Sequence, residues 1–299
     1  MVTYNSSKFI IESIVSILNQ TFKNFELIIC DDNSTDNTWE IICSYNDDRI
    51  IKIKNERNLG EYQNRNKAIA LAKGEWIIFI DGDDILYEFG LEIMLSQAIK
   101  NIDCGMVITR PWDERILYPI KISPKQLYQF QYLDTSIIGI NFTKVLFKRS
   151  AILDVGCFDN QNIKMGDAYI QYRIGMLYPS LIMQDGFSWW RRRKGQASEK
   201  LIKNTHLYIL DSYLYLLPML KDKNNPLSNE EKKIAFNNIY GNYLRFLCRQ
   251  FLYLKIFKVF NLLKKHPIPI KYLKAIAIPQ QREYFNKYSG ENPLTQCLN

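Results

Sequence analysis

Short apolar runs alternate with amphipathic segments along the first hundred residues of this chain. Three runs dominated by apolar residues predict strands buried on both faces, at 25–30, 50–53 and 76–80. Four segments whose apolar residues recur at helical spacing predict helices, at 9–20, 39–45, 61–73 and 91–100. This alternation predicts a doubly wound α/β sheet, mostly parallel and flanked by helices.

The pattern is less regular between residues 100 and 199. Two further strands are expected at 104–109 and 144–148, separated by a stretch with several prolines. A glycine-bounded loop over 156–166 leads into a predicted helix at 167–176. These elements extend the same α/β domain.

The character of the chain changes near Lys200, after which glycine is scarce and helical patterning continues to about Lys265. We therefore predict an α/β domain over 1–199 and a helical region over 200–299. The net charge is +8, and residues 200–299 carry 16 Lys and Arg against 6 Asp and Glu. The basic excess therefore lies in the second region, which indicates a separate task for it.

Composition and leader signals bound the class of protein. Hydrophobic residues make up 47% of the chain and charged residues 23%, which is typical of a globular protein and excludes disorder as the main state. Neither a signal peptide nor a long uncharged apolar span is visible. The cysteines lack CxxC spacing and the two histidines lie apart, which argues against a zinc site and for free thiols in the cytoplasm.

Two of the predicted strands end on acidic residues. Asp31 and Asp32 follow one apolar run, and Asp81 and Asp83, spaced as Asp-x-Asp, follow another. The carboxyl ends of strands in an open α/β sheet meet at the ligand-binding edge, so these side chains are expected to converge. Paired carboxylates are hard oxygen ligands that hold Mg²⁺ or Mn²⁺, often together with substrate phosphates. For a lone Asp-x-Asp, the alternative is a helix cap or a solvated pair of charges.

Several blocks in matching order and spacing resemble the family 2 glycosyltransferases of the GT-A fold. Among them are Thr3-Tyr4-Asn5, Asp31-Asp32-Asn33-Ser34, Asn58-Leu59-Gly60, Arg65-Asn66 and Phe79-Ile80-Asp81-Gly82-Asp83-Asp84. The resemblance is close over residues 1–100, looser to about residue 198, and does not extend past residue 200. It implies a GT-A fold and transfer of a sugar from a nucleotide-sugar donor.

The resemblance also implies roles on the nucleotide side of the site. Thr3, Tyr4 and Asn5 fall where the family contacts the nucleotide base. Asp32, together with Asp31, falls where a carboxylate meets the uracil or ribose. Family members carry a short apolar strand before the first block, whereas this sequence begins at Met1, so either the start is misplaced, the sequence is truncated, or the central strand is abbreviated.

Further roles concern the diphosphate and the acceptor. Arg65 lies where the family places a basic residue near the donor, and Asp81 and Asp83 match the metal-binding pair that bridges to the diphosphate. Asp167 resembles the base that deprotonates the acceptor hydroxyl for in-line attack with inversion. A helix N-cap is a second role for Asp167, and the two roles are compatible.

The stretch from Trp189 to Ser198 resembles the segment that closes over the donor phosphates. Arg191 and Arg193 are the expected phosphate contacts, because a guanidinium forms charge-assisted hydrogen bonds to phosphate oxygens. Many family members have His near position 193, and Arg is a poor metal ligand, so a third metal contact is not predicted there. A basic surface run is the alternative.

The basic region after residue 200 has two open interpretations. Residues 239–265 read as one aromatic-rich helix, in which Arg245 and Arg249 point away from Lys255 and Lys258. Scattered charges favour a bundle that covers the enzyme domain, whereas an amphipathic membrane helix keeps them together. We expect helices packed on the core with Lys and Arg facing an anionic membrane. No nucleic-acid-binding module is recognised.

These observations predict an inverting, metal-dependent glycosyltransferase in surface polysaccharide or glycolipid assembly, on the cytoplasmic face of a membrane. The expected donor is a UDP-sugar, and the expected acceptor is a hydroxyl of a saccharide or lipid-linked saccharide. A nucleotidyltransferase is an alternative, but the glycine-rich loop typical of that class is absent after Thr3. A non-catalytic nucleotide-sugar-binding subunit is another, and the presence of Asp83 and Asp167 argues against it.

Overall fold

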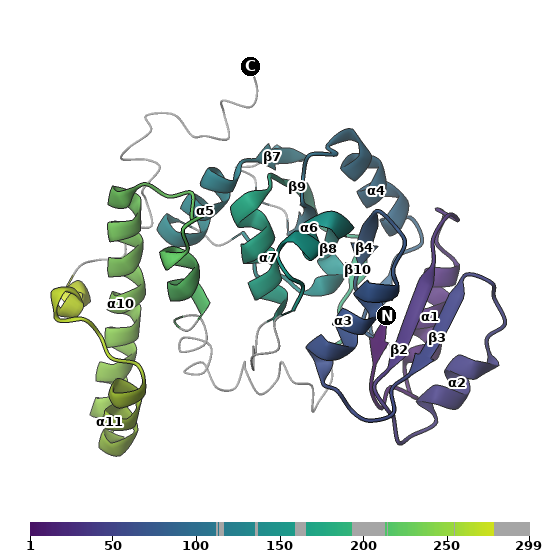
Figure 1. The fold of residues 1–299 in the computed structure, drawn as a ribbon, viewed down its shortest axis with the longest axis horizontal. Helices are drawn as coiled ribbons and strands as arrows, with labels where there is room; N and C mark the ends of the chain where they lie inside the picture. The colour runs from purple at the N-terminus through teal and green to yellow at the C-terminus, as the bar shows by residue number, and fades with distance from the viewer. Residues whose placement is uncertain are drawn as a thin grey trace. The chain divides into compact units, whose positions relative to one another are not determined.

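The computed structural model describes residues 1–111, 113, 117–134, 137–158, 166–192, 213, 215–253 and 255–277 (Figure 1). The chain forms two compact units, one of Met1–Pro124 and Ile138–Arg192 and the other of Lys125–Ile137 and Arg193–Asn299. The predicted domain boundary at residue 199 lies outside the described residues and stays a prediction. The segment Lys125–Ile137, which the sequence places in the first domain, groups with the second unit.

Three parallel strands build the amino-terminal part of the first unit, β1 (Val2–Thr3), β2 (Leu27–Asp31) and β3 (Ile50–Lys54), in that spatial order. The helices α1 (Ile10–Leu18), α2 (Thr38–Ser44) and α3 (Glu61–Leu71) flank them (Figure 1). Ile29 of β2 packs into one buried cluster with α1 and α2, while Cys30 packs into another with α3. Burial of both faces explains why the β2 sequence is continuously apolar. The strand β1 has two residues.

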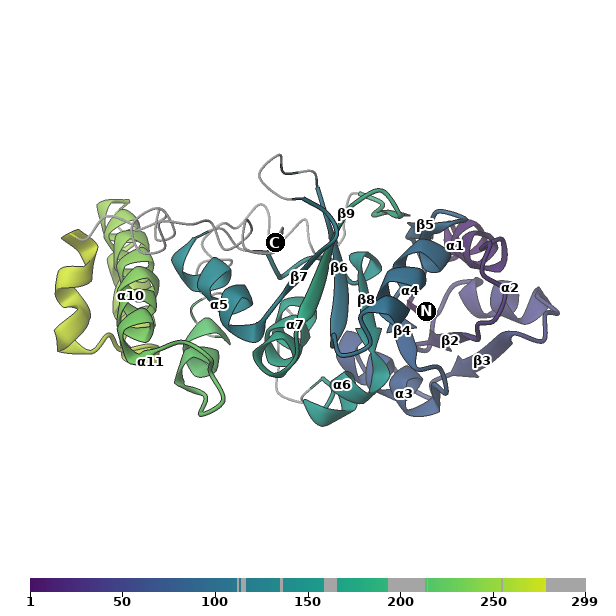
Figure 2. The same ribbon diagram turned by 90° about the horizontal axis from the view of Figure 1, so that it is seen from above.

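A five-stranded mixed sheet continues the first unit (Figure 2). Its strands in spatial order are β4 (Trp76–Ile78), β8 (Val145–Lys148), β6 (Met106–Arg110), β9 (Ser180–Gln184) and β7 (Ile120–Ile122). β6 and β9 run parallel, whereas β8 and β7 run antiparallel to their neighbours. A single bridge between Val2 and Asp81 joins the two sheets. The sequence predicts β4, β6 and β8 but not β7 and β9, and β7 is too short for its alternation to be recognised.

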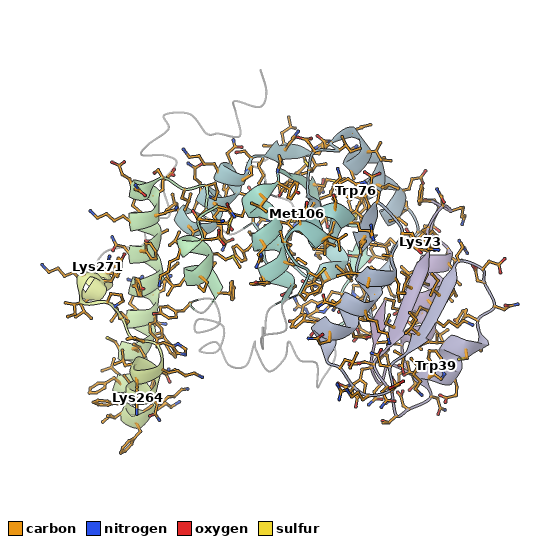
Figure 3. The ribbon with its side chains drawn as sticks, viewed as in Figure 1. Trp39, Lys73, Trp76, Met106, Lys264 and Lys271 are labelled. Carbon is orange, nitrogen blue, oxygen red and sulfur yellow. The ribbon has the colours of Figure 1, made fainter. Side chains whose placement is uncertain are left out.

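The remaining elements of the first unit cover these sheets. They are β5 (Ile85–Leu86), α4 (Gly90–Lys100), η1 (Phe142–Lys144), α6 (Arg149–Asp154), α7 (Gly166–Leu177) and β10 (Ser188–Trp189). Trp39 packs on the cluster formed by α1 and β2, and Trp76 packs on the cluster around Met94 of α4 (Figure 3). Both tryptophans therefore have the packing role expected from sequence.

The second unit is helical. It contains most of α5 (Pro124–Leu133), a helix over 215–221, α10 (Asn229–Leu252), α11 (Ile256–Lys265) and η2 (Ile270–Ala277). Ser228 and Glu231 form a reciprocal capping box at the start of α10. Glu231 also accepts a hydrogen bond from Gln129 at 2.6 Å, which ties α5 to α10. None of the described helices combines the length and apolarity needed to cross a membrane.

The expected continuous helix over 239–265 is wrong. The chain leaves helical geometry after Leu252 and starts a new helix at Ile256. Arg245 and Arg249 therefore belong to one helix, and Lys258 belongs to another. The expectation that these Arg and Lys side chains point away from one another assumed a single helix, and it does not hold.

Candidate active site

The carboxyl ends of β1 and β2 meet the Asp81–Asp84 turn at one edge of the sheet. The backbone N–H of Asp32 donates to Thr3 O at 2.9 Å, and the N–H of Gly82 donates to Val2 O at 3.0 Å. Gly82 is required here, because a Cβ would lie 2.6 Å from the Thr3 hydroxyl oxygen. The two acidic strand ends therefore flank β1 at the same edge, and convergence of their side chains on one ligand stays a prediction.

Asp31 and Asp32 are both buried and both engaged in hydrogen bonds within the protein. Asp31 accepts from the backbone N–H and the hydroxyl of Ser34. Asp32 accepts from the Asn55 side chain at 2.8 Å and from the backbone N–H groups of Leu59 and Gly60 at 2.8 and 2.9 Å. The two carboxylates thus shape the adjoining loops, and their contact with uracil or ribose stays a prediction.

Tyr4 and Asn5 lie on the loop that follows β1. Tyr4 is half-exposed, which leaves its ring accessible. Asn5 adopts a left-handed backbone with φ 51°, and its side-chain oxygen accepts from the Thr35 N–H at 2.9 Å. The Asn5 N–H donates to the Ser34 hydroxyl at 2.9 Å. These contacts join the loops after β1 and β2 into one rim, where nucleotide binding is the sequence-based expectation.

Arg65 of α3 lies fully buried between the acidic turn and two aromatic rings. Its Nη2 is 2.7 Å from Asp81 Oδ1 and 3.0 Å from Glu61 Oε1, and its guanidinium carbon is 4.2 Å from the Phe142 ring centroid. Burial by itself lowers the pKa of Arg65, but the charges of Asp81 and Glu61 outweigh it and raise the pKa above its ordinary value. The Nε and Nη1 groups are buried and have no hydrogen-bond partner among the residues that the structure describes. Arg65 therefore carries unused donors toward its surroundings.

The Asp81–Asp84 turn concentrates three carboxyl groups. The N–H of Asp84 donates to Asp81 O at 3.0 Å, the Asp81 side chain is 39% exposed, and Asp83 and Asp84 are buried. Asp81 and Asp83 suit a divalent cation as hard oxygen donors from one tight turn. Within the described part of the chain, no cluster of three His, Cys, Asp or Glu side chains could hold a metal.

Arg191 is fastened to this turn. Its backbone N–H donates to Asp84 Oδ1 at 3.1 Å, and its Nε donates to the Asp83 carbonyl at 2.9 Å. The guanidinium also lies 4.7 Å from the centroids of both the Phe9 and the Trp189 rings. The structure therefore brings Arg191 to the acidic turn, and its contact with the donor phosphates stays a prediction; Arg193 lies outside the described residues.

Asp167 stands at the start of α7. Its Oδ1 accepts from the N–H of the next residue, Ala168, at 2.8 Å. Asp167 belongs to the first turn of α7, and its roles as helix N-cap and as base stay predictions. The pKa of Asp167 is raised to about 6, mainly by burial and also by the charges of Glu61 and Asp81, while the hydrogen bond from the Ala168 N–H and the charge of Arg65 lower it. Asp167 therefore shares an electrostatic environment with Arg65 and the acidic turn. A carboxyl group with this pKa is mostly ionised near neutral pH and can accept a proton.

Glu61 and Tyr62, which the sequence analysis passes over, complete the surroundings of Asp167. The Tyr62 hydroxyl accepts from the Gly166 N–H at 2.8 Å, and a Cβ on Gly166 would lie 2.3 Å from the Tyr62 ring. Glu61 is half-exposed, and its carboxylate forms an ion pair with the same Arg65 guanidinium that pairs with Asp81. The only sequence signal for Glu61 was its i, i+4 spacing to Arg65, and nothing local pointed to Tyr62.

Two amide side chains fix the frame around α7. The side-chain amide of Asn66 donates to the Phe158 carbonyl oxygen at 2.7 Å, and its Oδ1 accepts from the Phe158 N–H at 3.0 Å. Buried Gln171 accepts from the N–H of Gly139 at 2.9 Å and also pairs with the backbone of Ile140. These contacts hold the segments that lead into α7.

An apolar cavity lies at the opposite edge of the sheet. It is lined mainly by apolar side chains of β2 and β4, together with residues that precede those strands, such as Glu26 and Lys73 (Figure 3). None of the predicted site residues lines it. The chemistry therefore belongs at the carboxyl edge.

Comparison with known proteins decides the family. The model of the family described as glycosyl transferase family 2 matches residues 1–156, which is more than half of the chain. The chain belongs to glycosyl transferase family 2. Membership in this family confirms the resemblance noted from the sequence and favours glycosyl transfer over nucleotidyl transfer.

Curated glycosyltransferases match about a third of the chain. An Escherichia coli UDP-Glc:alpha-D-GlcNAc-diphosphoundecaprenol beta-1,3-glucosyltransferase, WfaP, is 51% identical over 81 residues, covering 27% of this chain and 32% of the relative. A second E. coli enzyme with the same described activity, WfgD, is 42% identical over 101 residues, covering 34% of this chain and 40% of the relative. The matches thus span about a third to two-fifths of these relatives.

Two solved structures share the fold. The structure of residues 1–349 of S. aureus TarS in complex with UDP-GlcNAc has a TM-score of 0.61 and 18% identity, covering 82% of this chain and 71% of TarS 1–349. The Pyrobaculum calidifontis mannosyltransferase PcManGT, in complex with GDP-Man and Mn²⁺, has a TM-score of 0.53 and 15% identity, covering 97% and 88% of the two chains. These likenesses confirm the GT-A fold predicted from the sequence.

Proposed function

We propose that this family 2 protein transfers a sugar from a nucleotide-sugar to an acceptor hydroxyl with inversion, assisted by a divalent cation. One observation carries the proposal. Arg65 joins the acidic turn, through Asp81, to the electrostatic environment of Asp167, so candidate metal ligands and a candidate base share one sheet edge. An inverting transfer needs both groups, one beside the leaving group and one beside the acceptor.

A cation held by Asp81 and Asp83 would neutralise the charge that develops on the leaving nucleoside diphosphate. Mg²⁺ and Mn²⁺ both suit carboxylate and phosphate oxygens. Arg191 would add a guanidinium beside the same phosphates. Thr3, Tyr4 and Asn5 form the rim on which the nucleotide base would rest.

Asp167 would act as the base. A pKa of about 6 keeps most of this carboxyl ionised at neutral pH while leaving it a better proton acceptor than an ordinary aspartate. It would remove the proton of the acceptor hydroxyl as the oxygen attacks the anomeric carbon. Because attack comes from the face opposite the leaving diphosphate, the configuration inverts.

The relatives guide the choice of substrates. WfaP and WfgD are described as acting with UDP-Glc on GlcNAc-diphosphoundecaprenol. We take a UDP-hexose as donor and a lipid-linked saccharide as acceptor for this chain, in surface polysaccharide or glycolipid assembly. A lipid-linked acceptor would place the reaction at the cytoplasmic face of a membrane.

Calorimetric titration of the full chain with a panel of nucleotide-sugars, with and without Mn²⁺, tests the proposal. We expect one UDP-sugar to bind, and only when the cation is present. A folded protein that binds none of the donors would contradict the proposal. Metal-dependent binding without transfer to any saccharide or lipid-linked acceptor would instead indicate a non-catalytic nucleotide-sugar-binding subunit.

A further inference from the structure

An apolar surface of the second unit lies on residues that the active site does not use. Nine exposed large hydrophobic side chains are concentrated in the short segment 251–273. They are Phe251, Leu252, Tyr253, Ile256, Phe257, Phe260, Leu263, Ile270 and Leu273. We call this set the α11–η2 surface. Single exposed hydrophobic residues are ordinary, but a concentration of this size marks a binding surface.

Helix α11 presents its apolar residues outward. Phe257 is 89% exposed and Phe260 is 70% exposed, and their i, i+3 spacing puts both rings on one side of the helix. Ile256 lies beside these rings. Val259 is buried and lies about 160° around the helix axis from Phe257, but only about 40° from Leu263, so Leu263 marks the margin between the exposed and buried sides. The aromatic face is therefore a property of the folded helix.

The 3₁₀-helix η2 is held in a similar way. Tyr272 stacks on Tyr240 of α10 with ring centroids 4.3 Å apart, and the carbonyl of Ala275 would be 2.7 Å from a Cβ on Gly241. These contacts fix one side of η2 against α10. Ile270 and Leu273, three residues apart in a helix with three residues per turn, share the exposed side.

The charge around this surface has one sign. Residues 232–277 contain ten Lys and Arg residues and no Asp or Glu. Lys264 and Lys265 end α11, and Lys271 and Lys274 lie on η2 (Figure 3). All four side chains are exposed. The surface therefore combines aromatic groups with an uncompensated positive field.

The combination of exposed apolar side chains and positive charge indicates which kind of partner binds this surface. A second copy of the chain would bring two segments of like charge together, which is unfavourable. A duplex nucleic acid would use the lysines but leave the two exposed phenylalanines of α11 in water. A single strand could stack its bases on these rings but would leave the exposed aliphatic side chains, such as Ile270 and Leu273, in water. An anionic bilayer satisfies both, because lysine side chains reach lipid phosphates while aromatic groups enter the boundary between headgroups and acyl chains.

We propose that the α11–η2 surface docks the protein onto an anionic lipid bilayer. Phe257 and Phe260 enter the headgroup region, and Lys264, Lys265 and Lys271 contact lipid phosphates. The break between α10 and α11 makes this possible, because the direction in which the basic side chains of α11 point no longer depends on the helical phase of α10. Docking goes beyond sugar transfer and does not depend on it.

Co-sedimentation of the full chain with vesicles tests the proposal. Vesicles of phosphatidylcholine with phosphatidylglycerol are compared with vesicles of phosphatidylcholine alone. We expect binding to the anionic vesicles to be about tenfold tighter and to weaken as salt is added. The vesicles contain no saccharide lipid, so the result is independent of the transferase proposal.

Paired substitutions separate the two components of binding. Phe257→Ser with Phe260→Ser should weaken binding to anionic vesicles about tenfold, and Lys264→Gln with Lys265→Gln should reduce both the affinity and its salt dependence. The matched controls are Ile99→Ser with Ile102→Ser, which are exposed residues of the first unit, and Lys23→Gln with Lys100→Gln. Circular dichroism confirms that each variant is folded.

Three outcomes would overturn the proposal. The first is failure of the unmodified chain to bind anionic vesicles. The second is equal binding by the unmodified chain and the Phe257→Ser, Phe260→Ser variant. The third is a dimer in sedimentation analysis that the same variant dissociates, which would assign the surface to a second copy of the chain.

Discussion

Arg65 Nη2 lies 2.7 Å from Asp81 Oδ1, and this buried ion pair ties helix α3 to the turn that carries the candidate metal ligands. The same nitrogen lies 3.0 Å from Glu61. The Arg65 guanidinium thus pairs with two carboxylates, and its charge lowers the pKa of a third carboxyl group, that of Asp167. The charges on α3 therefore set the conditions under which the candidate base works.

Glu61→Gln should move the acid limb of the activity profile to lower pH. The Glu61 charge raises the pKa of Asp167, so its removal lets the carboxyl ionise earlier. Because Glu61 is half-exposed, we expect the midpoint of the acid limb of the kcat profile to move by about half a pH unit. Initial rates at saturating donor across pH 4–8 measure it. Glu40→Gln, an exposed change on α2, is the control and should leave the limb in place.

Arg65→Met should move the same limb in the opposite direction. Arg65 lowers the pKa of Asp167, so loss of the guanidinium raises that pKa and protonates the base at higher pH. Methionine retains apolar contact with Phe142, and Asp81 and Glu61 can be hydrated because both are partly exposed. Identical pH profiles for Arg65→Met and Glu61→Gln would refute the opposed effects of these two charges.

Asp167→Asn should abolish transfer and leave donor binding intact. It should also change the pH dependence of stability. The folded-state pKa of Asp167 is about 6 against an ordinary 3.8, so the folded protein binds the extra proton and loses that stabilisation as pH rises from about 4 to 6. The Asp167→Asn variant has no carboxyl group at this position and does not lose stability in this way as the pH rises. Its melting temperature, measured relative to the unmodified chain, should therefore be higher at pH 7 than at pH 4.

Tyr62→Phe should lower kcat with little change in donor affinity. It removes the acceptor of the Gly166 N–H at the start of α7, beside Asp167. A lost hydrogen bond of this kind costs about 1 kcal/mol, which corresponds to roughly a fivefold effect if Asp167 is displaced. Gly166→Ala should be more severe, because its Cβ would lie 2.3 Å from the Tyr62 ring. A rise in donor KM without loss of kcat would show that this contact serves the nucleotide side instead.

Removal of the cation with a chelator should abolish nucleotide-sugar binding, and Asp83→Ala should have the same effect with the cation present. The reason is that the diphosphate and the acidic turn repel each other without a bridging cation. Calorimetry with the preferred donor measures both. Asp48→Ala, an exposed acidic residue in the loop before β3, is the control and should bind donor normally. Unchanged, metal-dependent donor binding by Asp83→Ala would exclude Asp83 as a ligand.

The sequence by itself determined the local elements of the first hundred residues. Strands such as β2 are buried on both faces and therefore read as continuous apolar runs, and the acidic residues that end them mark the ligand edge of the sheet. The order and spacing of the blocks from Thr3 to Asp84 were sufficient to indicate the family. These features are local in the chain, so they can be recognised without knowing what packs against them.

Only the tertiary structure decided which side chains share an environment. Asp167 and Glu61 lie more than a hundred residues apart in the chain, and their proximity arises because α3 and α7 meet, with Tyr62 holding Gly166. No periodicity encodes such a contact. The strands β7 and β9 escaped prediction for the same reason, since they are defined by partners distant in sequence. The break after Leu252, which separates α10 from α11, likewise lacks a glycine or proline to announce it, and it alone decides which face the lysines of α11 present.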